Sequence, residues 1–534
     1  MSINKYLSEN EIYISQSTKI PQSLIYAEMS GLYGTRILRE MGEIIKYYNV
    51  YEKGAEFVAD SSKLDYVAAD LKIHQTAYLI NKEARFLFSK QPDIFIEPEL
   101  SGVNPSEFEA IKDDISLMQA YVDRVFEKTR FFGNLLKAAK DCFIGKRVAC
   151  FVNFNEDIQK IQINFSPSLE FVYETDPDDI DVLTKIVCFY TTVDSDNKAN
   201  QRIYKKKYWM NDDGFCWIEE GMYDGVGRLI EEITPERATK FTYIPAVIIR
   251  NDGLTGDLDG ESEVKNLQEY ESWMSRLNSA DIDAERQGMN SIKYTVDMSP
   301  ESTQGLSIAP GAFWDLSSDQ NADSPGSVGT LESSMGYSGS LDATLKRIKA
   351  SAYNELDIPD TSPDAMQGVV TSGKTLKAMY WGLIVRCDEK MQEWRPALEK
   401  ITRILIDGAH LYPKSTTPYS SQPIPDRVFN VKVDNQYSLP EDEQEEKQID
   451  LAEVNAQTMS KKAYMKKWRN LTDDEAEQEL KQIALERQLL EDSMSNMPPV
   501  DMSDMYSDDS SESGNTGQIS EDLNSPQQPT SAGE

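Results

Sequence analysis

The chain has 534 residues, of which 40% are hydrophobic, and its formal net charge is −35. Its length is enough for about two to four domains with cores of their own, and its longest apolar runs, such as residues 244–249, are too short to cross a bilayer. This acidic balance excludes tight binding of nucleic acid through neutralised phosphates, which requires clustered Lys and Arg.

Residue types used in nucleophilic or metal catalysis are scarce. The five cysteines are scattered and form no C-x-x-C pair, and the only histidines are His74 and His410. We therefore expect no metal site, no disulfide framework and no cofactor. The N-terminal stretch has no charged-then-apolar signal pattern, so we expect the protein to be made and kept in a cytoplasm.

The first 145 residues are predicted to be mainly helical. Apolar residues recur at helical spacing between Leu64 and Ile80, and Pro92 ends this block before a short strand at residues 93–97. A second helical block is predicted from Pro105 to about Gly145.

A β region follows. Between Lys146 and Arg250, short runs rich in Val, Ile, Phe and Tyr alternate with turn residues, which predicts antiparallel strands. One run, Tyr204–Trp209, places three lysines between aromatic residues. We interpret it as an edge strand whose lysines deter aggregation; stacking on nucleic acid is the alternative. Residues 251–260 are similar in composition to a calcium loop but lack its register and its last glutamate, so we interpret them as a turn-rich linker.

The next pattern is helix, insert, helix. One helix is predicted from about Glu263 to Gly288, and a second begins near Ser340. Between them, Ser291 to Ser334 is loop-rich with brief strand signals. Two long helices with a small module at their tip are typical of a projecting structural element rather than a catalytic pocket.

Residues 368–375 read Gly-Val-Val-Thr-Ser-Gly-Lys-Thr, a complete phosphate-loop pattern. A working phosphate loop follows a buried strand, whereas the residues before this one include Pro359 and Pro363. The pattern therefore also fits a proline-containing loop before a helix capped by Thr371 or Ser372.

The residues after this pattern help to distinguish a phosphate loop from a proline-containing loop before a helix. From Leu376 to Leu405, apolar residues repeat at spacings of three and four, which predicts one long helix kinked at Pro396. Asp407, the best candidate for a magnesium ligand, continues this helix instead of ending a strand. We favour the loop-and-helix interpretation and keep a nucleotide hydrolase using Lys374 and Asp407 as the alternative.

The C-terminal part is predicted to contain a strand at Val428–Gln436 and then helices up to about Leu490. After Arg487 the sequence has no Lys or Arg, and ten acidic residues lie between Glu491 and Glu534. Beyond Asp492 the composition is too polar for a core, so a disordered tail is predicted.

Several strings resemble the portal proteins of tailed bacteriophages with long non-contractile tails. In chain order they are ARFLFSKQPDIFI (84–96), FFGNLLKAAKDCFIGKRVACFVNF (131–154), DIPDTSPDAMQGVVTSGKTLK (357–377) and SLPEDEQEEKQIDLAEV (438–454). The third is the closest match, because a proline-containing loop leads into Ser-Gly-x-x-Leu at 372–376. Residues 89–92 depart from the pattern, with Ser-Lys-Gln-Pro where the family often has Gly-Lys-Pro. The resemblance covers roughly residues 40–490.

The resemblance implies an α+β fold: a portal-type ring subunit with a mainly helical stem and crown, a mixed α/β wing and a small β-containing clip. The implied regions are a wing with an N-terminal helical arm (1–260), stem helix 1 (261–290), clip (291–335), stem helix 2 (336–356), tunnel loop (357–371), long helix and wing strand (372–440), crown helices (441–492) and disordered acidic tail (493–534).

The resemblance also implies a function without chemistry of its own. Portals are homo-oligomeric rings, usually of about twelve subunits, at one capsid vertex of the virion, and they assemble in the host cytoplasm. Double-stranded DNA passes through without sequence-specific binding during packaging and ejection. The implied partners are the terminase motor, scaffolding protein, major capsid protein and the head-tail connector or adaptor, with no membrane. A capsid or tail structural protein without a channel is a further alternative.

Two sets of site residues follow from the resemblance. The expected tunnel loop around the DNA comprises Ile358, Pro359, Asp360, Thr361, Ser362, Pro363, Asp364, Ala365, Met366, Gln367, Gly368, Val369 and Val370. The expected docking surface on the clip comprises Ser307, Ile308, Phe313 and Trp314.

Overall fold

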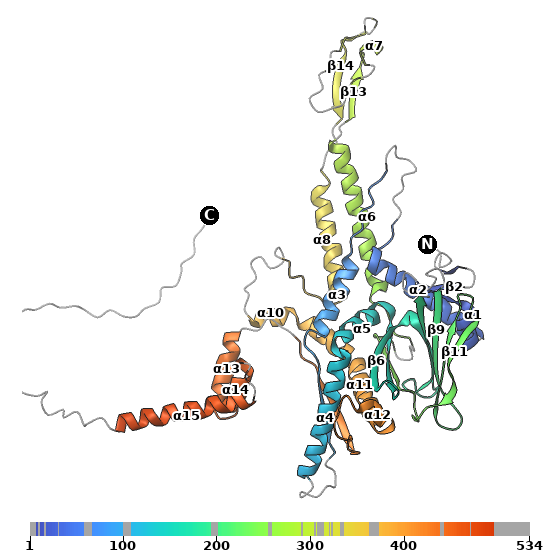
Figure 1. Ribbon diagram of the computed structural model, residues 1–534. Helices are drawn as coiled ribbons and strands as arrows, with labels where there is room; N and C mark the ends of the chain where they lie inside the picture. The colour runs from blue at the N-terminus through green and yellow to red at the C-terminus, as the bar shows by residue number, and fades with distance from the viewer. Residues whose placement is uncertain are drawn as a thin grey trace, which may run out of the picture. The chain divides into compact units, whose positions relative to one another are not determined.

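The computed structural model describes residues 7–8, 11–14, 18–29, 31–57, 67–99, 108–193, 201–254, 259–289, 292–303, 306, 314, 316–319, 321, 324–331, 336–362, 373–437, 443–469, 471 and 473–495. The chain divides into two compact units, Met1–Pro440 and Glu441–Glu534, which are described separately. The first unit combines helices with several small sheets (Figure 1), which confirms the predicted α+β class.

The N-terminal part of the first unit is largely helical. Its helices are α1 (Gln22–Glu28), α2 (Gly31–Lys53), α3 (Gln75–Leu87), α4 (Phe108–Thr129) and α5 (Phe131–Gly145). The helical prediction for the segment before α3 is wrong over residues 67–74, which form neither helix nor strand. Pro105 lies outside the described residues, and the predicted second block is divided at Arg130, which has a left-handed backbone with φ of 54°.

The strands of the first unit pair antiparallel in five sheets within the described residues. The largest has the order β11-β10-β9-β8-β7, and another has the order β12-β5-β6. The bounds of the strands in these two sheets are β5 (Arg147–Asn155), β6 (Lys160–Pro167), β7 (Phe171–Thr175), β8 (Leu183–Val193), β9 (Gln201–Met210), β10 (Cys216–Tyr223), β11 (Leu229–Ala238) and β12 (Ala246–Arg250). The 3-10 turn η4 (Ser168–Glu170) lies between β6 and β7.

The smaller sheets complete the first unit. They are β1 (Leu7–Ser8), β2 (Glu11–Ile14) and β3 (Thr18–Pro21); β4 (Asp93–Pro98) with β15 (Phe429–Asp434); and β13 (Ile292–Val296) with β14 (Ser327–Leu331). The free edge of β4 is covered by Gln119 of α4, whose amide accepts from Ile96 N–H at 2.8 Å and donates to Ile94 C=O at 2.9 Å. One side chain thus replaces a neighbouring strand, which satisfies backbone groups of an edge.

The lysine-rich run is central in its sheet, so its prediction as an edge strand is wrong. It lies in β9, between β10 and β8. Glu28 of α1 contacts Lys205 at 2.8 Å and Lys207 at 3.2 Å, and Glu220 on β10 contacts Lys206 at 3.0 Å. Burial alone would raise the pKa of Glu28, but the surrounding lysines lower it to about 2. These lysines therefore join α1 to the sheet and are neutralised within the subunit.

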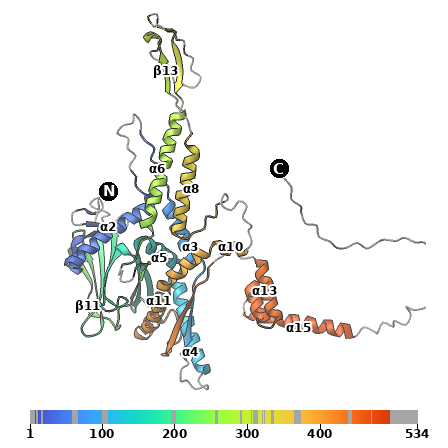
Figure 2. The ribbon, with the colours of Figure 1, turned by 180° about the vertical axis from the view of Figure 1, so that it is seen from behind.

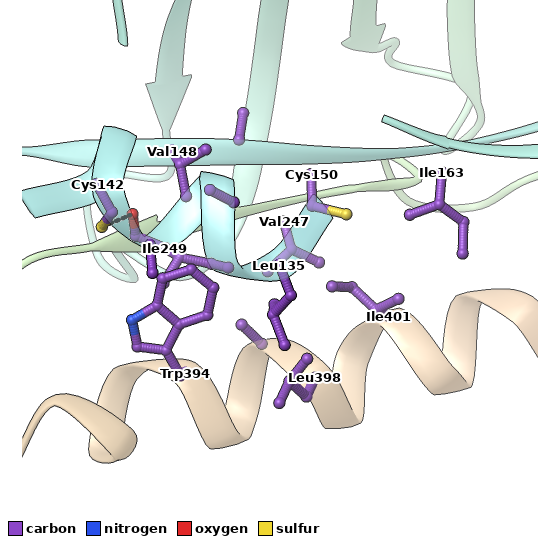
Figure 3. Close-up of a cluster of buried hydrophobic side chains, with 14 of the residues drawn as sticks. Leu135, Cys142, Val148, Cys150, Ile163, Val247, Ile249, Trp394, Leu398 and Ile401 are labelled. Atoms are coloured by element: carbon purple, nitrogen blue, oxygen red, sulfur yellow. Dashed lines mark hydrogen bonds between the residues drawn. The ribbon is translucent and has the colours of Figure 1, made fainter. Parts of the chain in front are cut away.

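The main core lies between a long helix and the three-stranded sheet. Helix α11 (Trp381–Leu411) lays its apolar stripe against α5, β5 and β12 (Figure 3). The labelled side chains there are Leu135, Cys142, Val148, Cys150, Ile163, Val247, Ile249, Trp394, Leu398 and Ile401. All are buried, and burial of this kind contributes about 1.5–3 kcal/mol per large apolar side chain. The predicted helical stripe is confirmed from Leu383 to Leu405.

Two helices form a projecting pair. Helix α6 (Val264–Met289) packs against α8 (Ser338–Glu355), and the segment between them carries β13, the short helix α7 (Pro300–Thr303) and β14 (Figures 1 and 2). Tyr294 of β13 pairs with Gly329 of β14, and a Cβ on that glycine would lie 2.4 Å from the tyrosine ring. The ring thus covers the glycine across the hairpin.

A polar ladder joins α6 to the segment before α3. Four side chains at intervals of four residues on α6 accept backbone N–H groups: Glu271, Ser275, Ser279 and Asp283. The donors, in reverse chain order, are Thr76, Ile73, Leu71 and Ala69, at 2.7, 3.1, 2.9 and 3.0 Å. Glu271 also accepts from Ala55 at 2.8 Å. We call residues 67–74 the strap.

Geometry explains the register of this ladder. Four helical residues rise about 6 Å, and two residues of extended chain rise about 6.6 Å. The amides of Ala69, Leu71 and Ile73 therefore meet Asp283, Ser279 and Ser275 in turn, which satisfies the backbone of a segment that has no sheet partner among the described residues. Thr76, the donor to Glu271, already lies in the first turn of α3. Gly54 lies beside Glu271, at the end of the ladder nearest the start of α6. It has φ of 79°, and a Cβ there would lie 3.2 Å from both Glu271 and Lys72, so a glycine suits this position.

The second unit contains the helices α13 (Glu443–Asn455), α14 (Lys461–Arg469) and α15 (Asp473–Ser495). Asp450 of α13 accepts from Trp468 Nε1 at 2.7 Å and pairs with Lys467 at 2.8 Å, which fixes α14 on α13. Helix α15 extends to Ser495, so the first residues of the predicted disordered tail are helical. The rest of that tail lies outside the described residues.

We expect Ser275→Ala to loosen the strap. The hydroxyl of Ser275 is fully buried and is the acceptor for Ile73 N–H, so its removal leaves that donor unsatisfied, at a cost of about 1–3 kcal/mol. Hydrogen exchange should show faster exchange at Ile73. Ser272→Ala is the matched control, because the Ser272 hydroxyl makes no hydrogen bond to the described residues. Unchanged exchange at Ile73 in Ser275→Ala would contradict the ladder.

Candidate functional site

The loop predicted to line a channel begins in a tightly held turn after α8. Leu356 and Ile358 are 1% and 2% exposed, and between them Asp357 has a left-handed backbone with φ of 51°, a conformation that Asp tolerates better than most residues. The turn is closed by Ile358 N–H, which donates to Tyr353 C=O at 3.0 Å. A Cβ on Gly382 would lie 3.2 Å from the Asp357 side chain, so the glycine allows α11 to approach closely.

Two lysines clamp the next residues. Lys82 of α3 donates to Pro359 C=O at 2.9 Å and to Thr361 Oγ1 at 3.4 Å, and Lys349 of α8 pairs with Asp360 at 3.0 Å. Burial would raise the pKa of Asp360, but Ser362 N–H and the Lys349 ammonium hold it below its usual value. Residues 356–362, which we call the loop base, are thus fixed by side chains from two helices.

The described residues of the predicted tunnel loop differ in how deeply they are buried. Ile358 is buried, Pro359, Asp360 and Ser362 are half-buried, and Thr361 is exposed. The remaining predicted residues of the loop, Pro363 to Val370, lie outside the described residues. The side chain of Ile358 is therefore an anchor in the core.

The phosphate-loop pattern reaches the described residues only at its end. Gly373 to Thr375 form the first turn of helix α10 (Gly373–Met379), which is separated from α11 at Tyr380. Asp407 lies inside α11 and accepts a hydrogen bond from Tyr243 at 2.6 Å. A magnesium-binding aspartate should end a buried strand, so Asp407 lacks the expected setting. Pro396 lies within α11, where the kink is predicted.

A buried cluster of charges joins α11, the second helix after the loop, to the rest of the unit. We define this charge cluster as Glu83, Asn251, Asp252, Glu263, Arg386 and Lys390. Lys390 Nζ lies 2.5 Å from Glu263, 2.8 Å from Asn251 and 3.1 Å from Asp252. Arg386 bonds Glu83 at 2.9 Å and Glu263 at 2.6 Å. α11 is thereby tied to α3, to the end of β12 and to the start of α6.

The two glutamates of this charge cluster are in different electrostatic states. Burial would raise the pKa of Glu263, but Lys390 and Arg386 lower it to about 2. Burial dominates at Glu83 and raises its pKa, and its Oε2 has no hydrogen-bond partner among the described residues. Glu263 is thus the charged partner of the two cations, and Glu83 is the less well solvated carboxyl.

This charge cluster is not predicted by the sequence patterns, although a signal for its lysine is present. Lys390 lies three residues after Cys387 and four before Trp394, both of which belong to the apolar stripe. A lysine at such a position is buried unless it reaches the surface, and buried charges require partners. The partners themselves could not be found, because they lie more than 100 residues away in the sequence.

The predicted docking surface is described at one residue. Trp314 is half-buried, and Lys293 Nζ of β13 lies 4.6 Å from its ring centroid. Ser307, Ile308 and Phe313 lie outside the described residues. Neighbouring apolar side chains on the hairpin are exposed, namely Tyr294, Val296 and Val328.

Two kinds of site were looked for in the part of the chain that the structure describes, metal-binding clusters and membrane-spanning helices. Groups of three or more His, Cys, Asp or Glu side chains arranged to hold a metal ion are not found there. Among the same residues, helices long and apolar enough to span a membrane are also not found.

We expect Lys390→Met to destabilise the first unit by about 3–5 kcal/mol, because it leaves Glu263 buried without one of its cations. Urea unfolding followed by fluorescence measures the change. Lys432→Met is the matched control, since its 3.5 Å pair with Asp434 is more than half exposed and contributes about 0–1 kcal/mol. Similar unfolding midpoints for the two variants would contradict the assigned role of the charge cluster.

Comparison with known families gives a match over most of the chain. The family described as phage portal protein, SPP1 Gp6-like, matches residues 34–490. This range contains the projecting helix pair, the loop base, the charge cluster and the described helices of the second unit up to residue 490. A comparison with curated proteins finds no match. The family match covers well over half of the sequence, and the chain therefore belongs to the phage portal protein family of the SPP1 Gp6-like type.

Proposed function

We propose that the chain is the subunit of a portal ring of about twelve copies that surrounds the DNA at one capsid vertex. In this proposal the ring admits the genome during packaging, docks the terminase motor and the head-tail connector, and releases the genome on ejection. It assembles in the host cytoplasm with scaffolding and major capsid proteins. Membership in the portal family is the main support.

The observation that carries the channel proposal is the construction of the loop base. A loop that meets moving DNA must be held firmly at its ends. Lys82 and Lys349 clamp its first residues from α3 and α8. Beyond the loop and the short helix α10, the charge cluster fixes α11. We assign the anchoring role to Ile358 and the DNA-facing role to the other predicted residues of the loop, Pro359 to Val370.

Charge also supports a passage in which DNA slides without binding. The chain carries −35, and the lysines of β9 are paired with glutamates of the same subunit. An acidic lining repels a polyanion over about a Debye length, roughly 10 Å at moderate salt. DNA in such a channel would meet little electrostatic trapping.

The projecting pair α6 and α8 supports separate roles for a stem and a clip. In this proposal the pair is the stem and the β13–β14 module is the clip, where the motor and later the connector dock. The exposed Tyr294, Val296 and Val328 and the half-buried Trp314 are available there for a protein partner. The clip residues Ser307, Ile308 and Phe313 remain part of the proposed docking surface.

Two other functions are separable by experiment. A nucleotide hydrolase would use Lys374 and Asp407, and the helical setting of Asp407 speaks against it. A capsid or tail protein without a channel would form other assemblies. Electron microscopy of the purified protein distinguishes this last class: rings of about twelve subunits with a central hole support the portal, and solid or filamentous particles contradict it.

We expect Lys374→Ala to leave both ring formation and DNA packaging unchanged, because this lysine has no nucleotide to bind in a portal. Rings are counted by electron microscopy, packaged DNA is measured by nuclease protection, and phosphate release is measured with ATP. Asp407→Asn serves as the parallel variant. ATP hydrolysis by the purified chain that is abolished by Lys374→Ala would overturn the portal proposal in favour of the enzyme.

Lys82→Met should leave rings intact and lower DNA packaging several-fold, because the loop base loses its donor to Pro359 C=O. Nuclease-protected DNA per assembled capsid is the measurement. Lys90→Met is the control: Lys90 is exposed on the turn that follows α3. Equal packaging by the two variants would show that the clamp is not needed for loop function.

A further inference from the structure

A cleft lies between α2, the strap and α6. Its volume is about 510 Å³, and its lining includes Lys46 and Lys53 from α2, Lys72 from the strap, and Trp273 and Arg276 from α6. The wall is held in place by the polar ladder, because Ile73 beside Lys72 donates to Ser275. The position of Lys72 beside α6 is therefore set by backbone hydrogen bonds that do not involve its own side chain.

Several cations gather in this cleft, and its lysines are not neutralised within the subunit. Among the described residues, Lys46, Lys53 and Lys72 form no ion pair, although the whole chain has 90 acidic and 55 basic residues. Two carboxylates, Glu56 and Glu269, also line the cleft. With Arg276, the cations outnumber these acids by two, so the cleft is a local positive site on a strongly negative protein.

Trp273 adds an apolar contact to this charge. Its side chain is 46% exposed although the residue is large, and the Arg276 guanidinium lies 4.8 Å from its ring centroid. Trp and Arg are the residues most often found at the energetic centre of protein interfaces. A stacked Trp–Arg pair beside lysines of this kind fits a protein segment that supplies carboxylates and an apolar side chain.

We propose that this cleft is one half of the contact between neighbouring subunits and that it receives an acidic surface of a second copy of this chain. The inference rests on the proposed ring and adds the site of its contact. In a closed ring each contact joins two different surfaces of the same chain. The surplus of carboxylates on every copy provides the complementary charge, and Trp273 provides apolar burial.

DNA is the other polyanion that such lysines could bind, and the cleft fits it less well. Glu56 and Glu269 lie among the lysines and would repel phosphates, whereas a protein segment can place its carboxylates beside the cations and avoid the acids. Base stacking on Trp273 would require unpaired bases, but the genome that a portal passes is double-stranded.

Charge reversal tests the proposal directly. The triple variant Lys46→Glu, Lys53→Glu and Lys72→Glu should raise the concentration needed for ring formation by at least about tenfold, because like charges would then face each other across the contact. Light scattering after gel filtration measures assembly. The control triple variant, Lys160→Glu, Lys414→Glu and Lys432→Glu, changes the net charge equally at exposed positions away from the cleft and should assemble normally.

Each outcome of this comparison has a defined meaning. Normal rings from the cleft variant would overturn the inference and leave the portal proposal intact, whereas an absence of rings in the unaltered protein would overturn the portal proposal itself. Equal loss of assembly in both triple variants would mean that only net charge matters, which also rejects the cleft. Circular dichroism and unfolding temperature must be unchanged in the unassembled chains; if they are not, the single variant Trp273→Ala replaces the triple variant in the same assay.

Cross-linking supplies an independent test that identifies the partner surface. Rings assembled from unlabelled and heavy-nitrogen-labelled copies are treated with a carbodiimide, which joins lysine to carboxylate without a spacer. Hybrid peptides linking Lys46, Lys53 or Lys72 to an acidic residue of the other isotope are expected. Their absence, with other hybrid peptides present, contradicts the inference. Binding of a short DNA duplex by the unassembled protein, lost only in the cleft variant, would reassign the cleft to DNA.

Discussion

The arrangement of the first unit depends on how one buried ammonium group is neutralised. Lys390 is held by Glu263 and Asn251, and it brings together the end of β12, the start of α6 and the middle of α11. Breaking a buried pair exposes the remaining charge to a medium that solvates it poorly. Helix α6 and the long helix α11 are therefore coupled through Lys390 and Arg386, which both lie on α11 and both bond Glu263 just before α6.

Burial of charge also explains how an acidic protein uses its lysines. Glu28 holds three lysines of the large sheet, from β8 and β9, and Glu220 holds Lys206. These cations are used inside the subunit, so they add nothing to an external positive surface. The cleft lined by Lys46, Lys53 and Lys72 differs because three lysines and Arg276 gather there, and the lysines form no ion pair with the described residues. This clustering is the reason for assigning a function to the cleft.

Periodicity predicted the long helix, because apolar residues at spacings of three and four from Leu383 to Leu405 fall on one face only if the segment is helical. The α+β class and the family resemblance were likewise accessible from local strings. Three features were not accessible in this way. The strap has apolar residues at helical spacing, yet α6 supplies acceptors that favour an extended backbone. The central position of β9 depends on strands that local alternation cannot order. The position of Lys390 in the apolar stripe predicts a buried lysine, but its partners are distant in the sequence and could not be predicted.

The ladder on α6 has a consequence for how the subunit tolerates change. It uses only main-chain groups of the strap, and most side chains of the strap are exposed, Lys72 in the cleft among them. On α6 the situation is reversed: Glu271, Ser275, Ser279 and Asp283 are fixed by an interval of four. Over evolution, the exposed side chains of the strap can therefore be substituted one at a time, provided that proline does not replace a residue whose N–H donates. The four acceptors on α6 must be kept.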